Sequence, residues 1–244
     1  MYFFFDTETT GLSRLKDRIV QIAWVITDRF DHVIQEQSFI IKPDGFQIPV
    51  NASNIHGIST AIAHRTGVEL LAALKKITND LSPVSTIIGH NISFDLGVLR
   101  SDLKRVGLPC HLDNKTHICT MKLSSTWCRL PKLNGSAGFK WPTLEELHYR
   151  LFGEYFEGAH DALADVHATR RCFFELLKKN IIVLPNQPER TTRPMARERS
   201  FSLTKAVDLA CEHCRANFSV TLNRYEIGAR CPNCSGLVQA CFHW

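Results

Sequence analysis

The sequence predicts an α/β protein: a main domain with a mixed β-sheet flanked by helices, followed by a small second domain. Three strand-like segments come first, at residues 2–6, 19–27 and 33–42, and helix-like and strand-like segments then alternate. Five of the nine cysteines crowd into the last 34 residues. This order of segments is typical of a mixed sheet with helices on its faces.

The first three segments are predicted strands. Residues 2–6 form a short apolar run suited to a buried strand, and residues 19–27 and 33–42 are rich in β-branched and aromatic side chains. Residues 28–31 are a plausible hairpin connection between the last two. We therefore expect the second and third strands to be neighbours in the sheet.

The following segments alternate between helix and strand. Ser59 or Thr60 is expected to cap a first helix, and residues 68–81 carry apolar residues at three- and four-residue spacing up to Pro83. Residues 86–89 and 116–119 are expected strands, with a helix near 94–106 between them. Thr143 is expected to cap a helix over 144–152, which Gly153 ends, and a last helix runs over about 162–179. A domain over 1–180 is large enough to bury roughly 70% of its unfolded surface.

Composition separates the domains and excludes several classes of protein. Hydrophobic residues make up 44% and charged residues 22%, which is ordinary for a folded protein. The segment 181–204 is rich in proline and arginine and is predicted to be a linker before residues 205–244. No apolar run approaches the ~20 residues that span a membrane, and no secretory signal precedes the first strand. These features favour a cytoplasmic protein that does not enter a membrane; the net charge of +5 decides nothing about its partners.

Asp6 and Glu8 lie two residues apart at the end of the first expected strand. Alternation along a strand places them on one face, where two acids this close commonly share a cation. Solvated acids after a strand are the other interpretation of this short pattern alone.

Three motifs, in this order along the chain, favour a shared cation over solvated acids: FDTETTGL at 5–12, GHNISFD at 89–95 and HDALAD at 160–165. Together they resemble the three sequence blocks of the DnaQ-like exonucleases, the DEDDh branch of the RNase H-like superfamily. The resemblance covers roughly residues 1–178. It implies a mixed five-stranded sheet flanked by helices and the 3′→5′ removal of nucleotides with two divalent metals.

The resemblance also implies the roles of individual residues. Asp6, Glu8, Asp95 and Asp165 would be the metal ligands, and His160 would be the general base. These residue types suit the chemistry, because oxygen ligands favour Mg²⁺ or Mn²⁺. Two such ions can activate a water and stabilise a leaving 3′ oxygen, and a histidine can accept the proton of that water near neutral pH.

Several polar and apolar residues are candidates for contacts with the substrate. Thr9, Thr10 and Leu12 match nucleotide-contacting positions of the family, although packing of a loop after a strand is an equal alternative. His56 either contacts substrate or orders the turn before a helix. Asn91 either positions substrate or, as is commoner for asparagine there, caps the following helix.

Other residues near these motifs have simpler interpretations. Asp161 is expected to favour the dipole at the start of its helix, and His167 is expected at the surface. The loop over 127–141 interleaves cations with aromatic residues. Such a loop suits a flexible single strand, whose phosphates and bases these side chains bind, or it is an ordinary surface loop.

The C-terminal cysteines form two pairs, CEHC at 211–214 and CPNC at 231–234. The spacing C-x₂-C-x₁₆-C-x₂-C predicts one structural Zn²⁺ held by Cys211, Cys214, Cys231 and Cys234, with a hairpin over 218–227 between the pairs. The segment resembles a zinc ribbon. A segment of ~40 residues needs such a staple to fold.

The sequence thus predicts a metal-dependent 3′→5′ exonuclease acting on nucleic-acid 3′ ends, with single-stranded DNA as the expected substrate. Two alternatives remain open at this point. One is an exoribonuclease, and the other is a non-catalytic module that only holds nucleic acid. The zinc ribbon is a possible docking site for a protein partner.

Overall fold

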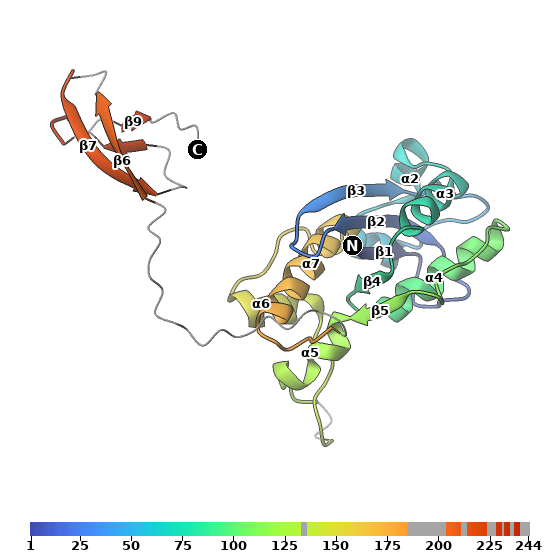
Figure 1. Ribbon diagram of the computed structural model, residues 1–244. Coiled ribbons are helices and arrows are strands. Elements are labelled where there is room, and N and C mark those ends of the chain that lie inside the picture. Colours follow the sequence, from blue (N-terminus) through green and yellow to red (C-terminus); the bar gives the residue numbers. More distant parts are fainter. Residues whose placement is uncertain are drawn as a thin grey trace. The chain divides into compact units, whose positions relative to one another are not determined.

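The computed structural model describes residues 1–132, 136–184, 204–210, 214–223, 228–230, 232–234 and 237–239. The chain divides into two compact units, Met1–Pro185 and Asn186–Trp244. Most of the expected linker, residues 185–203, lies outside the described part of the chain. Figure 1 shows the order of the elements in both units.

A five-stranded mixed sheet forms the centre of the first unit, in the order β3-β2-β1-β4-β5. Strand β2 (Ile19–Thr27) lies between β1 (Tyr2–Thr9) and β3 (Val33–Ile40) and is antiparallel to both. Strands β4 (Thr86–Gly89) and β5 (Thr116–Cys119) run parallel to β1. The expected mixed sheet of five strands is therefore confirmed, and β1 continues three residues beyond the predicted end of the strand.

Helices cover both faces of this sheet (Figure 1). On one face, Phe3 and Phe5 pack in a core with α3 (Leu70–Leu81) and α4 (Ile92–Arg105). On the other face, Tyr2 and Phe4 pack in a second core with α6 (Leu144–Phe152) and α7 (Ala162–Lys178). This second core includes Ile182, so packing extends past residue 180.

The helix boundaries follow local signals in the sequence. Thr143 caps α6 in a capping box with Glu146, and Gly153 ends it with φ 74°, as predicted. Ser59 caps α2 (Thr60–Thr66), but a short helix not expected from the sequence, α1 (Val50–His56), precedes it. A further unexpected helix, α5 (Thr120–Cys128), includes the start of the segment that was predicted to be a loop.

In its described ranges, the second unit contains two small antiparallel hairpins. Strand β6 (Thr204–Ala210) pairs with β7 (Asn217–Asn223), and β8 (Gly228–Arg230) pairs with β9 (Leu237–Gln239). The hairpin expected over 218–227 is wrong in its described part, because residues 218–223 belong to the single strand β7, which pairs with the preceding strand β6. Residues 224–227 lie outside the described residues. No helix in the described ranges is long and apolar enough to cross a membrane.

Candidate active site

The two acids of β1 lie at the end of the central strand. Phe4 faces the core formed with α6 and α7, and alternation places Asp6 and Glu8 on that same face. Both are partly exposed, unlike the phenylalanines before them. The pairing of β1 with β2 is irregular between Glu8 and Thr9, so the strand is distorted where its acids end.

Asp95 approaches this edge from the opposite helical layer. It lies in the first turn of α4 with only 4% of its surface exposed. Thr7, which points to the α4 face, donates to Asp95 Oδ1 from its backbone N–H at 3.2 Å and from its hydroxyl at 2.7 Å. Burial raises the pKa of Asp95 to about 7, although these hydrogen bonds oppose the shift.

Asp165 lies in the first turn of α7, on the side of the sheet that Asp6 and Glu8 face. Its Oδ1 atom is buried and has no hydrogen-bond partner. Burial raises the pKa of Asp165 to about 7; Asp161 and Glu145 raise it further, while a hydrogen bond from the backbone of His160 lowers it. A buried carboxylate oxygen without a donor is one that a cation would satisfy.

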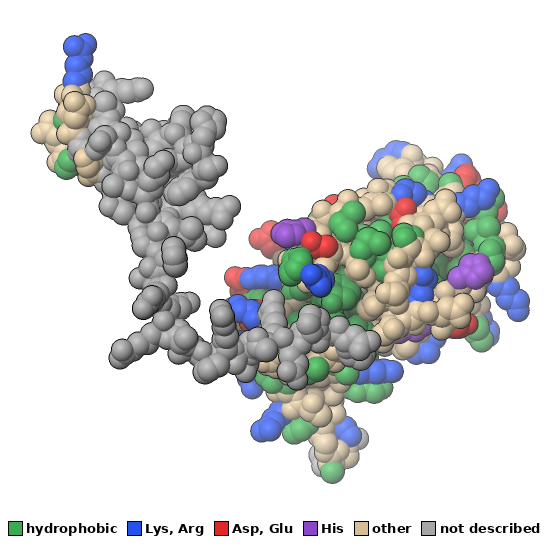
Figure 2. All heavy atoms as spheres, viewed as in Figure 1, with side chains coloured by type: hydrophobic (Ala, Val, Ile, Leu, Met, Phe, Trp, Pro, Cys, Tyr) green, Lys and Arg blue, Asp and Glu red, His purple; other side chains and the backbone are tan. Residues whose placement is uncertain are grey.

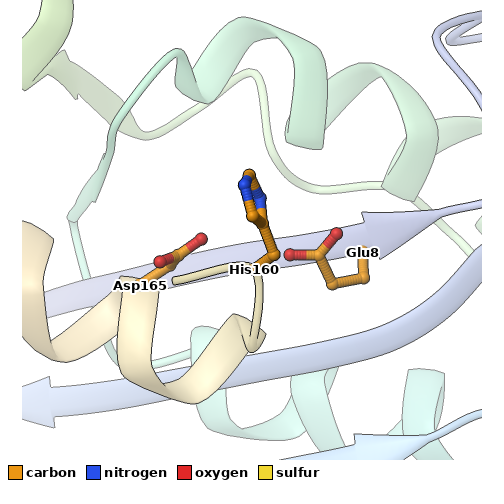
Figure 3. Close-up of side chains that lie close together, drawn as sticks. All are labelled: Glu8, His160 and Asp165. Atoms are coloured by element: carbon orange, nitrogen blue, oxygen red, sulfur yellow. The ribbon is translucent and has the colours of Figure 1, made fainter. Parts of the chain in front are cut away.

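Glu8, His160 and Asp165 form a compact group (Figure 3). One ligand atom from each, a carboxylate oxygen or a ring nitrogen, lies within 4.8 Å of the other two. Glu8 comes from β1, Asp165 from α7, and His160 from the turn before α7. His160 is exposed and has φ 68°, a left-handed conformation that costs a non-glycine residue about 1 kcal/mol.

Asp6 completes a set of four carboxylates that repel one another. The pKa of Asp6 is raised well above its ordinary range, first by burial and then by Asp95, Asp165 and Glu8. The pKa of Glu8 is raised to about 8, by burial and then by Asp165 and Asp95. This edge of the sheet therefore concentrates negative charge, and the hard oxygen donors that gather there fit a divalent cation.

Gln21 and Asp161 hold the start of α7 against the sheet, a connection that the sequence analysis did not predict. Asp161 caps α7 by accepting from the backbone of Leu163 at 3.0 Å and of Ala164 at 3.1 Å. Gln21 on β2 donates to Asp161 Oδ2 at 2.8 Å and accepts from Ala162 N at 3.1 Å. A single polar residue within an apolar strand was the available signal for Gln21.

Asp161 thus acts as a capping residue, which is more specific than the expected contribution to the helix dipole. His167, on the same helix, pairs with Glu36 at 2.9 Å and is partly exposed. This position is compatible with the expected place of His167 near the surface, outside the carboxylate group.

The loop after β1 holds Leu12 out into solvent. The Thr9 hydroxyl donates to Gly11 O at 2.7 Å, and the Thr10 hydroxyl donates to Asp17 Oδ1 at 2.8 Å. Leu12 itself is 92% exposed. The two threonine side chains therefore have partners within the loop, whereas Leu12 and Leu15, the latter 80% exposed, extend into solvent.

His56 and Asn91 lie on other segments. His56 ends α1, and its Nδ1 accepts from Ile58 N at 3.1 Å, while its Nε2 is buried without a partner. Burial lowers the pKa of His56 and the nearby His160 lowers it further, although interactions with the backbone of His56 and Thr9 oppose the shift. Asn91 precedes α4 with φ 63° and makes no side-chain capping bond, so the capping interpretation of Asn91 is wrong.

The fold and this edge define the chain as an α/β protein with the RNase H-like arrangement of the exonucleases. The RNase_T family, described as Exonuclease, matches residues 3–173. The chain therefore belongs to the exonuclease family.

Relatives in two groups support the assignment. The DNA polymerase III PolC-type of Streptococcus suis is 30% identical over 177 residues, which are 72% of this chain and 11% of that protein. The same type of polymerase from Pediococcus pentosaceus is 27% identical, again over 72% of this chain and 11% of the relative. The chain thus spans about a tenth of the length of these polymerases.

The solved structures that resemble the chain include exonuclease I of E. coli in complex with a dA16 oligonucleotide. It superposes with a TM-score of 0.61 at 26% identity, covering 73% of this chain and 40% of that one. A zinc-bound form of the same exonuclease with single-stranded DNA gives the same values. The similarity covers two fifths of exonuclease I.

Proposed function

We propose that the protein is a metal-dependent 3′→5′ exonuclease that removes nucleotides from the 3′ ends of nucleic acid, with single-stranded DNA as its substrate. One observation carries this proposal. Four carboxylates from β1, α4 and α7 converge on one edge of the sheet beside an exposed histidine, and the pKa of each carboxylate is raised.

In this proposal the carboxylates of Asp6, Glu8, Asp95 and Asp165 hold two Mg²⁺ or Mn²⁺ ions. The buried Oδ1 of Asp165, which lacks a hydrogen-bond donor, supports the assignment. Thr7 fixes the orientation of Asp95 through two hydrogen bonds to Oδ1, which leaves Oδ2 as the oxygen not held by Thr7. Bound in this place, two ions supply an activated water and stabilise the leaving 3′ oxygen.

His160 is the proposed general base. Its ring lies beside Glu8 and Asp165 but remains exposed to water, where it can take a proton from the attacking water and pass it to solvent. Its backbone lies in a turn that begins with Gly158 at φ 78°. The hydrogen bond from the His160 backbone to Asp165 couples the position of the base to that of a metal ligand.

The substrate contacts are proposed at Thr9, Thr10, Leu12, His56 and Asn91. Leu12, whose side chain extends from the loop into solvent, would pack on a base of the 3′ end. The hydroxyls of Thr9 and Thr10 hold the shape of that loop through hydrogen bonds. His56 Nε2, buried and unpartnered, is a polar group available to the terminal nucleotide. Asn91 is available because its side chain does not cap α4.

The relatives and structural neighbours of the chain favour DNA over RNA as the substrate. Its relatives include DNA polymerases, and its structural neighbours include an exonuclease solved with dA16 and dT13. An exoribonuclease is the alternative that a comparison of substrates decides. The complete set of four carboxylates favours catalysis over a module that only holds nucleic acid.

The second unit is proposed to be a zinc ribbon with one structural Zn²⁺. Cys214 lies in the turn between β6 and β7, and Cys234 lies in the turn between β8 and β9. Two hairpins whose turns carry the cysteine pairs suit a four-thiolate site. The other two ligands, Cys211 and Cys231, lie outside the described residues. We assign the ribbon to substrate or protein-partner engagement.

The cysteines of the first unit suit a cytoplasmic location. Cys110, Cys119, Cys128 and Cys172 are all free thiols. Free thiols persist in a reducing compartment, where thiolates also remain available to bind zinc.

The test is digestion of four 5′-labelled substrates in parallel: single- and double-stranded DNA and RNA of one sequence, each in Mg²⁺, Mn²⁺ or EDTA. We expect a ladder of shortened single-stranded DNA with either metal and none with EDTA. Asp165→Ala should abolish the ladder, whereas Asp113→Asn, a change at an exposed carboxylate paired with Arg100, should not. Intact single-stranded DNA after incubation in Mn²⁺ would refute the proposal.

A further inference from the structure

A tryptophan is held at the surface between α5 and α6. Trp141 is 59% exposed, and its ring lies 5.7 Å from the ammonium group of Lys122 on α5, within the range of a cation–π contact. Ordering an exposed indole ring costs conformational entropy, and the ring also leaves apolar surface in contact with water. The backbone on both sides of Trp141 is held by hydrogen bonds, so the ring keeps a defined position at the surface.

The fixation comes from two neighbours of Trp141. The backbone N–H of Lys140 donates to Leu130 O at 2.9 Å, and the ammonium group of Lys140 pairs with Glu146 of α6. On the other side, Pro142 is buried and its carbonyl accepts from the ring of His90 at 2.9 Å. The residue before a proline is also restricted to extended conformations.

His90 is built to hold this loop. Because a carbonyl only accepts, Nε2 of His90 carries the proton, and Nδ1 accepts from the Thr120 hydroxyl at 3.0 Å. Burial lowers the pKa of His90 to about 4, so the ring stays neutral and this pattern of donor and acceptor is constant at neutral pH.

The same contacts join the tryptophan loop to the end of β4, which is the neighbour of β1 in the sheet. Phe4 pairs with Ile88 in the parallel register of β1 and β4, and His90 follows Gly89, the last residue of β4. Adjacent strands lie about 4.8 Å apart. On the other flank, Glu145 at the start of α6 is close enough to raise the pKa of Asp165. The loop that carries Trp141 is therefore joined to His90, just past the end of β4, and continues into α6, whose Glu145 acts on Asp165.

The charge of the surrounding chain is complementary to a phosphate backbone. Between Asp113 and Glu145 there is no acidic residue, but there are five lysines and arginines. Figure 2 shows basic and hydrophobic side chains together on the projecting part of the first unit that follows α5. A flat exposed ring beside cations is the combination that binds bases and phosphates of an unpaired strand.

We infer that Trp141, with Lys122, is a stacking platform for a base upstream of the nucleotide being removed, so that the site prefers unpaired strands of several nucleotides over single nucleotides or duplex ends. This inference rests on the proposed exonuclease function and specifies its substrate. A base stacks on the indole while the ammonium group of Lys122 contacts phosphate. A base in a duplex has both faces covered by its neighbours and cannot do this.

The experiment compares wild type with Trp141→Ala and Trp141→Phe on two substrates. The first is thymidine 5′-monophosphate p-nitrophenyl ester, which has no upstream base; the second is the single strand (dT)₅. With Trp141→Ala we expect kcat/KM on (dT)₅ to fall about 5- to 100-fold, as loss of one base–ring stacking interaction produces. Hydrolysis of the ester should stay within twofold of wild type, and Trp141→Phe should keep most of the activity on (dT)₅.

The matched control is Phe30→Ala. Phe30 is 61% exposed and lies under Arg29 at 4.7 Å, so it is also an exposed ring with a cation. It sits in the turn between β2 and β3, at the opposite end of the sheet from Glu8, because Tyr2 pairs with Thr27. Its removal should leave both substrates unaffected.

A second arm locates the stacked base. A series of (dT)₅ strands carries one abasic site each, placed one nucleotide further from the 3′ end in each strand. Wild type should bind one of these strands more weakly than (dT)₅, because that strand lacks the stacked base. Trp141→Ala should bind that strand and (dT)₅ equally. Anisotropy of labelled strands in EDTA measures this binding without hydrolysis.

The outcomes distinguish failure of the stacking platform from failure of the proposed exonuclease function. If wild type hydrolyses the ester but Trp141→Ala leaves (dT)₅ within twofold, the stacking platform is wrong and the exonuclease stands. If Trp141→Ala lowers ester and (dT)₅ rates equally, the residue supports the fold of the site and the inference is also wrong. If wild type hydrolyses neither substrate, the proposed function fails, and equal binding of (dT)₅ by wild type and Trp141→Ala then rejects the platform.

Discussion

Replacing Asp165 with asparagine should stabilise the metal-free protein at pH 8. Asp165 is surrounded by the other carboxylates, and its buried Oδ1 lacks a donor. A neutral amide of the same shape removes one of the four charges that repel one another. Without a cation, the wild-type site is therefore a source of instability that the variant lacks.

The sign follows from the raised pKa. An aspartate has a pKa of about 4 in an unfolded chain, and burial raises that of Asp165 to about 7 in the folded protein. The folded state then binds a proton more tightly than the unfolded state does. The stability due to this group is present below pH ~4 and is lost as the pH rises through about 7.

The full difference in pKa corresponds to about 4 kcal/mol at pH 8, at 1.36 kcal/mol per pKa unit. Asp165 is partly exposed, so solvent screens its charge, and we expect about half of this, roughly 2 kcal/mol. For a unit of this size, 2 kcal/mol raises Tm by roughly 4–8 °C. Near pH 4 the two proteins should melt together, because Asp165 is then protonated.

The assay is thermal unfolding followed by circular dichroism in EDTA at pH 4.5 and pH 8, and at pH 8 with Mn²⁺. Mn²⁺ should raise the Tm of wild type more than that of the variant, because wild type gains about 2.7 kcal/mol at a hundredfold excess over Kd and the variant, lacking a ligand, gains less. Asp44→Asn, at an exposed carboxylate outside the site, controls for the loss of one charge. Equal Tm values for wild type and Asp165→Asn in EDTA at pH 8 would contradict the argument.

Three further outcomes are expected. His160→Ala should lower kcat on single-stranded DNA ~10²–10⁴-fold with binding retained, measured by gel kinetics and anisotropy, and an unchanged kcat would remove it as the base. Gln21→Leu should lower kcat but not oligonucleotide affinity, because it releases Asp161 and the start of α7; Gln21→Glu, which keeps only an acceptor, should not restore it. Deleting residues 205–244 should remove one Zn²⁺ per chain by metal analysis and leave hydrolysis of a trinucleotide nearly intact; loss of that turnover by the folded first unit would show that the ribbon belongs to the active site.

The strands and the helix ends were predictable because local chemistry decides them. The apolar and β-branched run 19–27 is a strand with the predicted bounds. Thr143 and Gly153 bound α6 as predicted, because a hydroxyl satisfies free backbone N–H groups and glycine tolerates a positive φ. Helices α1 and α5 were missed, since they are short and neither begins with a side chain that caps it, although Gly57 ends α1 with φ 75°.

The acids of the site were also evident in the sequence, because three short motifs carry them at the ends of expected elements. Their convergence depends on the sheet order, in which β1 lies between β2 and β4. This order brings Asp95 from one helical layer and Asp165 from the other to the edge where Asp6 and Glu8 end. No local pattern contains that information.

The sequence by itself determined which residue types are present in which order: the four acids, the histidine, the paired cysteines and the alternating elements. Only the tertiary structure decided which of them have partners. It ties Thr7 to Asp95, Gln21 to Asp161 and His90 to the loop of Trp141, across separations of 88, 140 and 52 residues. The physical reason is that a hydrogen bond or a charge acts over a few ångströms in space, whereas a sequence pattern records only neighbours along the chain.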